Sequence, residues 1–131
     1  MKTIGNLRAD YSGRVILVVD DIKLNFVLVK AILKNTGADI LWAEDGFKAI
    51  EIVDSGRQID LILMDYNMPG INGSETARII REKNKGLPII SQTAQKSGEQ
   101  FLNIVRDYDD IIFKPLTPEK LITKINEHMP D

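Results

Sequence analysis

The sequence predicts an α/β protein whose parallel sheet is covered by helices on both faces. Five short apolar runs rich in branched residues recur along the chain, and a stretch with helical spacing follows each run. Two of these runs, VILVV and LILM, contain no polar residue, which is typical of strands buried on both sides. Alternation of strands and helices indicates a parallel sheet between layers of helices. The predicted strands are residues 15–19, 40–43, 61–64, 87–90 and 111–113.

The segments around these strands carry boundary signals. The run at 40–43 belongs to the mixed segment DILWA, which predicts an edge strand. Gly37 lies where the first helix, placed over residues 22–36, is expected to stop. Thr117 and Pro118 provide an N-cap and a first helical position for a last helix over 119–129.

Length and composition favour one ordinary globular domain. The chain has 131 residues, and we expect residues 14–131 to form the domain after a loosely held arm at 1–13. A net charge of -2 argues against direct binding of nucleic acid through several phosphates. No apolar run approaches the ~20 residues of a membrane span, and the start does not resemble a signal peptide. We therefore expect a cytoplasmic domain without membrane insertion.

The residue inventory restricts the chemistry further. The chain has no cysteine, which excludes disulfides, thiol nucleophiles and Cys-ligated metal centres. Its single histidine, His128, lies near the end of the last predicted helix, where we expect a solvated side chain rather than a catalyst. Any metal must therefore be bound by oxygen.

Three acidic residues follow predicted strands. Asp20 and Asp21 come directly after the first strand, and Asp65 comes directly after the third. Ligands of open parallel sheets collect outside the carboxyl ends of the strands. If these two strands are neighbours, three carboxylates face one small space, and their repulsion raises at least one pKa unless a cation enters. Oxygen ligands of this kind suit Mg²⁺, whereas the alternative is that the acids only cap the following helices.

A lysine at the end of the fifth strand completes a charge balance. Three negative charges from the carboxylates are matched by Lys114 together with one Mg²⁺. Metal and ammonium charges stabilise the transition state of phosphoryl transfer, so Asp65 is placed to attack an anionic phosphoryl group. The product of such an attack is an acyl phosphate.

Four motifs, in this order and spacing, resemble the receiver domain of two-component response regulators. They are VVDD at 18–21, LMDYNMPGING at 63–73, QTA at 92–94 and FKP at 113–115. The resemblance covers residues 14–129. It implies the flavodoxin-like receiver fold, with five parallel strands in the order 2-1-3-4-5 and five flanking helices. It also implies a role in two-component phosphorelay signal transduction.

The resemblance implies a role for each acidic residue. Asp65 would accept a phosphoryl group from a histidine kinase or a histidine phosphotransfer protein. Asp21, Asp65 and the main-chain carbonyl of Asn67 would ligate Mg²⁺, and Asp20 would act through bound water. The chain would phosphorylate and slowly dephosphorylate only itself, so it would not be a turnover enzyme.

The remaining motif residues would form the conformational switch. Lys114 would pair with the phosphoryl group, and Pro115 follows it through a peptide bond that is commonly cis in this family. Thr93 would move inward to hydrogen-bond the phosphoryl oxygens. Ala94 would leave room for the group.

Two positions depart from the receiver pattern. Ile111 stands three residues before Lys114, where the family usually has Tyr or Phe. The segment DYDD at 107–110 also lacks the glycine that commonly precedes the fifth strand. We therefore expect the aromatic part of the switch to be missing or altered, and the loop before the fifth strand to be distorted.

The first predicted helix has an apolar arc wider than packing on a sheet requires. Exposed rims of such an arc are candidates for docking a helix of the phosphodonor. The alternative is that arm residues such as Leu7 or Tyr11 fold over them. Asn25, inside the arc, is expected to be hydrogen-bonded structure. The docking candidates are Ile22, Leu24, Phe26 and Val27.

Other functional classes fit the sequence less well. A phosphatase with an Asp nucleophile commonly needs a second Asp two residues on, where this chain has Asn67. A nucleotide or flavin module would need a glycine-rich loop after the first strand, where this chain has acids. The alternative that we retain is a degenerate receiver that binds partners without phosphorylation.

The context of the domain is suggested by its first residues. Asn25 and the lead-in YSGRVILVVDD resemble receivers attached to hybrid sensor histidine kinases, so the chain is a candidate for the cytoplasmic part of a membrane-bound hybrid kinase. Its expected partners are a histidine kinase or a histidine phosphotransfer domain. A weak homodimer is the other protein contact that we consider.

Overall fold

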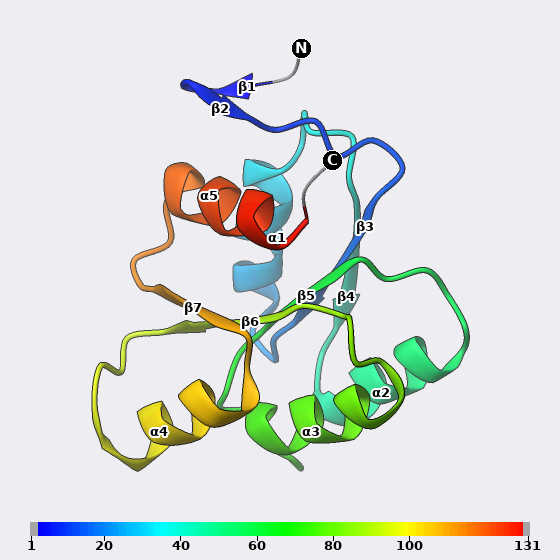
Figure 1. Cartoon of the computed structure of the whole chain (residues 1–131), viewed down its shortest axis with the longest axis vertical. Coiled ribbons are helices and arrows are strands. Elements are labelled where there is room, and N and C mark those ends of the chain that lie inside the picture. The colour runs from blue at the N-terminus through cyan, green and yellow to red at the C-terminus, as the bar shows by residue number, and fades with distance from the viewer. Residues whose placement is uncertain (1–2, 130–131) are drawn as a thin grey trace.

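A five-stranded sheet is the scaffold of the protein. The computed structural model describes residues 3–129. Its sheet strands are β3 (Val15–Val19), β4 (Asp39–Ala43), β5 (Leu61–Met64), β6 (Ile89–Thr93) and β7 (Asp110–Phe113). All of them run parallel in the order β4-β3-β5-β6-β7 (Figure 1), so the strand order implied by the receiver resemblance and the edge position of DILWA are both confirmed.

Helices cover both faces of the sheet. α1 (Lys23–Ile32) and α5 (Pro118–His128) lie on one face, whereas α2 (Gly46–Asp54), α3 (Gly73–Lys83) and α4 (Gly98–Asp107) lie on the other (Figure 1). Side chains of β3 alternate between the two cores, as the pleat of a strand requires. Within residues 3–129, no helix is long and apolar enough to cross a membrane.

Two elements differ from the sequence prediction by more than one residue at an end, β6 and α1. β6 spans Ile89–Thr93 rather than 87–90, because Pro88 has no amide hydrogen to donate and because the polar side chains that follow Ile90 are buried. α1 ends at Ile32 rather than at residue 36, and Thr36 turns back to donate its hydroxyl hydrogen to the Leu33 carbonyl at 2.7 Å.

The N-terminal segment is folded, so the prediction of a loosely held arm is wrong for its described residues. β1 (Thr3–Ile4) and β2 (Leu7–Arg8) form an antiparallel hairpin beside α5 (Figure 1). Tyr11 is buried and donates its hydroxyl hydrogen to Asn126 Oδ1 at 2.7 Å. The Asn126 side-chain amide donates in turn to the Arg8 carbonyl at 2.9 Å. These contacts join residues at opposite ends of the chain, which local sequence patterns do not report.

We expect Tyr11→Phe to lower the free energy of unfolding by about 1 kcal/mol, since it removes a buried hydrogen-bond donor and leaves Asn126 Oδ1 without that bond. Urea denaturation measures the change. Ser55→Ala is the control, because it removes a hydroxyl bond that is exposed and should cost less. Equal urea midpoints for Tyr11→Phe and the wild type would show that this bond does not hold the segment.

Candidate functional site

The acidic residues converge because β3 and β5 are neighbours. The ladder between these two strands continues one peptide further, where Asp65 N–H donates to the Val19 carbonyl at 3.0 Å. The ladder between β3 and β4 does the same, because Asp20 N–H donates to the Ala43 carbonyl at 3.1 Å. Carboxylate oxygens of Asp20, Asp21 and Asp65 lie within 4.8 Å of one another as a result. The convergence expected for neighbouring strands is therefore present.

Asp20 is the most firmly held of the three acids. Its carboxylate is buried and accepts hydrogen bonds from Ile22 N–H at 2.9 Å and from the Asn25 side-chain amide at 3.1 Å. Burial raises the pKa of Asp20, and the two donors oppose that effect. Asn25 is hydrogen-bonded structure, as predicted, and its partner is an acid of the site. Asp21, by contrast, is exposed.

Asp65 carries the largest electrostatic strain among these acids. Burial, and after it the charge of Asp20, raises the pKa of Asp65 to about 6, while Lys114 and the Tyr66 N–H act in the opposite direction. The Tyr66 N–H donates to Asp65 Oδ1 at 2.9 Å. An elevated carboxyl pKa beside two further acids indicates negative charge that a bound cation would relieve.

The ends of β6 and β7 bring two predicted switch residues to the same edge of the sheet. Lys114 N–H donates to the Thr93 carbonyl at 2.9 Å. The Thr93 side chain is buried, and its Oγ1 accepts a hydrogen bond from Gln95 N–H at 3.0 Å. Lys114 is exposed, and its positive charge lowers the pKa of Asp65. The roles assigned to Thr93 and Lys114 stay predictions, although their location fits them.

The neighbours of these residues fit the receiver pattern in part. Ala94 is exposed beside Thr93, and the Lys114–Pro115 peptide bond is cis. Asn67 is exposed in the loop after β5, so its main-chain carbonyl as a metal ligand stays a prediction. Ile111 lies half-buried in β7 beside Ser91, and this position therefore offers no aromatic ring.

Two aromatic residues that sequence reasoning did not assign to the site make contact with it. The Trp42 indole N–H donates to the Asp20 carbonyl at 2.8 Å, and the Tyr108 hydroxyl donates to the Asp65 carbonyl at 3.0 Å. Burial, and after it the charge of Asp65, raises the pKa of Tyr108 above its ordinary range, so the hydroxyl keeps its proton. In the sequence, the only feature that set the segment around Tyr108 apart was the absence of the usual glycine from residues 107–110.

The apolar rim of α1 reaches solvent, as predicted. Ile22 is 53 % exposed, Leu24 73 % and Val27 46 %, so the N-terminal segment does not cover these three side chains. Phe26 differs, because it is half-buried and stacks on Trp42 with ring centroids 5.6 Å apart. Phe26 therefore supports the fold, and the docking hypothesis is better based on the other three residues.

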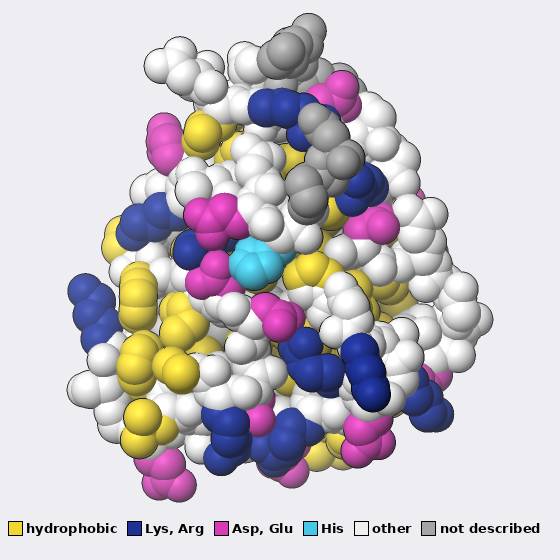
Figure 2. All heavy atoms as spheres, in the orientation of Figure 1, with side chains coloured by type: hydrophobic (Ala, Val, Ile, Leu, Met, Phe, Trp, Pro, Cys, Tyr) yellow, Lys and Arg dark blue, Asp and Glu magenta, His cyan; other side chains and the backbone are white. Residues whose placement is uncertain are grey.

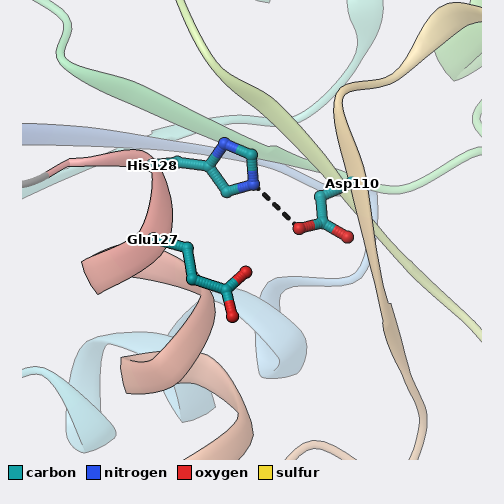
Figure 3. Close-up of side chains that lie close together, drawn as sticks. All are labelled: Asp110, Glu127 and His128. Carbon is teal, nitrogen blue, oxygen red and sulfur yellow. Dashed lines mark hydrogen bonds and ion pairs between the residues drawn. The ribbon is translucent and has the colours of Figure 1, made fainter.

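A second group of metal-ligand types lies where α5 meets β7. Figure 3 shows His128 and Glu127 of α5 facing Asp110 of β7. His128 Nε2 lies 2.8 Å from Asp110 Oδ2, so the expectation of a merely solvated histidine is wrong. Lys124 Nζ contacts both carboxylates, at 3.0 Å from Asp110 and 3.4 Å from Glu127. We interpret the group as an ion-pair cluster that ties α5 to the sheet.

Comparison with known proteins decides the family. A family model described as the response regulator receiver domain matches residues 16–126. The chain belongs to the response regulator receiver family. Receiver domains act in two-component phosphorelays, generally depend on Mg²⁺ and interact with histidine kinases or phosphotransfer domains.

Similar receivers occur in sensor proteins and in regulators. This receiver is 33 % identical over 112 residues to the sensor protein GacS of Pseudomonas syringae pv. syringae, which is 81 % of this chain and 12 % of GacS. It is 36 % identical over 113 residues to the sensor protein EvgS of Escherichia coli K12, 86 % of this chain and 9 % of EvgS. The DNA-binding response regulator MtrA of Mycobacterium tuberculosis is 32 % identical over 115 residues, 87 % of this chain and 50 % of MtrA. The receiver thus spans only part of each relative.

Solved structures agree with this assignment. The chemotaxis protein CheY4 of Vibrio cholerae superposes with a TM-score of 0.80 at 26 % identity, over 88 % of this receiver and 98 % of that chain. A CheY-like receiver domain protein of Methanospirillum hungatei gives a TM-score of 0.79 at 26 % identity, over 87 % and 91 %. The receiver fold is therefore shown by sequence and by structure.

In the absence of divalent cations, we expect Asp65→Asn to raise the free energy of unfolding at pH 7.5 by about 1–3 kcal/mol. The folded pKa of Asp65, about 6, lies above the ordinary value of 3.8, so the folded wild type holds the extra proton and loses stability as the pH rises between these values. The gain should disappear below about pH 4, where both states are protonated. Urea denaturation in EDTA across this range measures it.

Asp110→Asn is the matched control with the opposite sign. Burial alone would raise the pKa of Asp110, but hydrogen bonds from His128, the Ile111 N–H and Lys124 hold it below the ordinary value. Asp110→Asn should therefore lower the free energy of unfolding at pH 7.5, and the difference from the wild type should become smaller at acid pH. Equal stability of Asp65→Asn and the wild type at pH 7.5 would contradict the charge strain at Asp65.

Proposed function

We propose that this receiver accepts a phosphoryl group from a phosphohistidine onto Asp65, that the reaction depends on Mg²⁺, and that Thr93 and Lys114 convert the modification into a conformational change. The observation that carries the proposal is the convergence of three carboxylates within 4.8 Å at the carboxyl ends of the strands, where Lys114 also follows β7. Structural acids that only cap helices would not need to be gathered in this way.

Asp65 is the nucleophile in this proposal. Its Oδ1 is held by the Tyr66 N–H, which leaves Oδ2 to attack. A bond forms between the carboxylate oxygen and phosphorus as the bond between phosphorus and the donor's histidine nitrogen breaks. The nitrogen keeps the bonding electron pair and takes up a proton from solvent. The product is an acyl phosphate, which water later hydrolyses.

The donor set suits Mg²⁺. The ligands would be carboxylate oxygens of Asp21 and Asp65 and the main-chain carbonyl of Asn67, with Asp20 acting through water; all are oxygen donors, which this ion prefers. When bound, Mg²⁺ supplies positive charge that stabilises the phosphoryl oxygens in the transition state. Asp20 is oriented for its part by Asn25 and the Ile22 N–H.

The switch is proposed to work from the ends of β6 and β7. Thr93 Oγ1 accepts from Gln95 N–H, so its own hydrogen is free to be donated to a phosphoryl oxygen. Lys114 would pair with the same group, and the backbone bond between Lys114 and Thr93 couples the two strand ends. Ala94 adds only a methyl group beside them, which leaves room for the phosphoryl oxygens.

The activity is proposed to be confined to the receiver itself. It would phosphorylate and slowly dephosphorylate Asp65 without turning over other substrates. A kinase activity would belong to other parts of a hybrid sensor kinase, and the cytoplasmic location and weak homodimer stay predictions. The degenerate receiver is the second candidate, and Ile111 favours it only for the output step.

The phosphorylation proposal predicts one Mg²⁺-dependent adduct. We expect incubation with acetyl phosphate to add a single phosphoryl group to the wild type, measured by intact mass, and to add none to Asp65→Asn. An adduct of equal yield on Asp65→Asn would place the reaction elsewhere. Absence of both the adduct and beryllofluoride binding in the wild type would instead favour the degenerate receiver.

The docking proposal places a helix of the phosphodonor on Ile22, Leu24 and Val27, next to Asp21. We expect Leu24→Asp to slow transfer from a phosphorylated histidine phosphotransfer protein at least about tenfold more than transfer from acetyl phosphate. Docking of the partner helix would bury the charge of the new aspartate, which opposes binding. Leu102→Asp is the matched control, because Leu102 is 65 % exposed on α4, where Figure 2 shows hydrophobic side chains gathered over α4 and β7. Equal slowing by both variants would contradict docking at α1.

A further inference from the structure

We propose that Tyr108 is a positioning residue for the phosphoacceptor, because its hydroxyl fixes the peptide plane that orients the Asp65 carboxylate. The inference rests on the proposed function of Asp65 and adds a residue to it. It assigns a role to the segment 107–110, where the sequence departs from the receiver pattern.

Tyr108 reaches the phosphoacceptor from a distant part of the chain. It lies between α4 and β7, is only 6 % exposed, and donates its hydroxyl hydrogen to the main-chain carbonyl of Asp65 at 3.0 Å. The hydroxyl thus supplies a hydrogen-bond donor to a carbonyl beyond the end of β5. Without this donor, the buried hydrogen-bond requirement of the carbonyl would have to be met in another way.

The same peptide unit also holds the Asp65 side chain. The Asp65 carbonyl and the Tyr66 N–H belong to one planar peptide, so they point in opposite directions and turn together. Tyr108 holds the carbonyl, and the Tyr66 N–H donates to Asp65 Oδ1 at 2.9 Å. Fixing the carbonyl therefore aims the N–H at Oδ1 and presents Oδ2 for the reaction.

Gly73, the first residue of α3, makes this contact sterically possible. A Cβ at this position would collide with the Tyr108 hydroxyl and the Asp65 carbonyl oxygen. The Gly73 N–H also donates to the Tyr66 carbonyl at 2.7 Å, so the next backbone group along the loop is held as well. The backbone after Asp65 is thus restrained from both α3 and Tyr108.

The segment that carries Tyr108 is itself anchored. The carboxylate of the preceding residue, Asp107, is buried and contacts Arg78 of α3 at 2.8 Å and Arg106 of α4 at 2.8 Å. The Tyr108 N–H donates to the Ile104 carbonyl at 2.9 Å. These bonds give the tyrosine a defined place, which a positioning residue requires.

The test compares Tyr108→Phe with the wild type and with Tyr11→Phe. Tyr11→Phe is a matched control, since it also removes one buried tyrosine hydroxyl bond but lies at the N-terminal hairpin. Phosphorylation by acetyl phosphate at saturating Mg²⁺ is followed by the fluorescence of Trp42, the single tryptophan, which is hydrogen-bonded to the Asp20 carbonyl. Intact mass confirms the adduct.

We expect Tyr108→Phe to lower the maximal phosphorylation rate constant roughly tenfold, with a change of less than about twofold in the acetyl phosphate concentration that gives half of that rate. Tyr11→Phe should react at the wild-type rate. A general loss of stability would affect both variants, so this difference separates positioning from support of the fold.

A second readout needs no phosphorylation. In amide NMR spectra of the unmodified receiver, the Tyr66 N–H should shift upfield in Tyr108→Phe and in Gly73→Ala, because both variants disturb the peptide that it belongs to, and it should stay in place in Tyr11→Phe. A wild-type rate and an unchanged Tyr66 amide in Tyr108→Phe would overturn this inference alone. Absence of both a Mg²⁺-dependent adduct and beryllofluoride binding in the wild type would overturn the proposed function as well.

Discussion

One backbone hydrogen bond sets the geometry of the whole site: the Asp65 N–H donates to the Val19 carbonyl, so the register of β5 against β3 continues past the ends of both strands. This bond holds the proposed phosphoacceptor beside the acids that follow β3. The Lys114 N–H and the Thr93 carbonyl repeat the arrangement at β6 and β7. Two strand pairs of one sheet therefore deliver the acids on one side and the switch residues on the other.

The same placement partly buries carboxyl groups beside one another, and burial and the neighbouring charges disfavour their ionised forms. Asp20 is stabilised by two hydrogen-bond donors, whereas Asp65 has the Tyr66 N–H on Oδ1. The carboxyl group with the weaker compensation has the pKa of about 6. That asymmetry suits different tasks, because a firmly bonded carboxylate orients a ligand while a carboxylate with one oxygen left over can act as a nucleophile. The positive charge of Lys114 reduces this effect at Asp65.

Aromatic side chains are used in this receiver in an unusual distribution. Position 111, where the family usually has Tyr or Phe, is Ile, and β7 instead carries Phe113, which stacks on Phe101 of α4 with ring centroids 6.4 Å apart. The tyrosine that does reach the site is Tyr108, and it contacts the backbone of Asp65. In our proposal α4 is therefore linked to the phosphoacceptor without an aromatic residue at position 111.

Long-range contacts were beyond the reach of sequence patterns. The hairpin beside α5 consists of two-residue strands, which are too short to show a periodicity, and Tyr11 meets Asn126 only after the chain ends come together. The true end of β6 was hidden because Thr93 and the polar residues before it are buried. Trp42 and Tyr108 gave no sign of their partners, because a hydrogen bond to a carbonyl that is distant in the sequence leaves no local pattern.

The sequence by itself determined the class of the fold, because short apolar runs typical of strands buried on both sides alternate with stretches of helical spacing. It also determined which residues have the chemistry for the site. The strand order came from the receiver resemblance, since periodicity does not say which strands are neighbours. Only the tertiary structure decided that the carboxylates meet within 4.8 Å, that Phe26 stacks on Trp42, and that the Tyr108 hydroxyl donates to the Asp65 carbonyl. The physical reason is that each of these contacts depends on the packing of several elements at once.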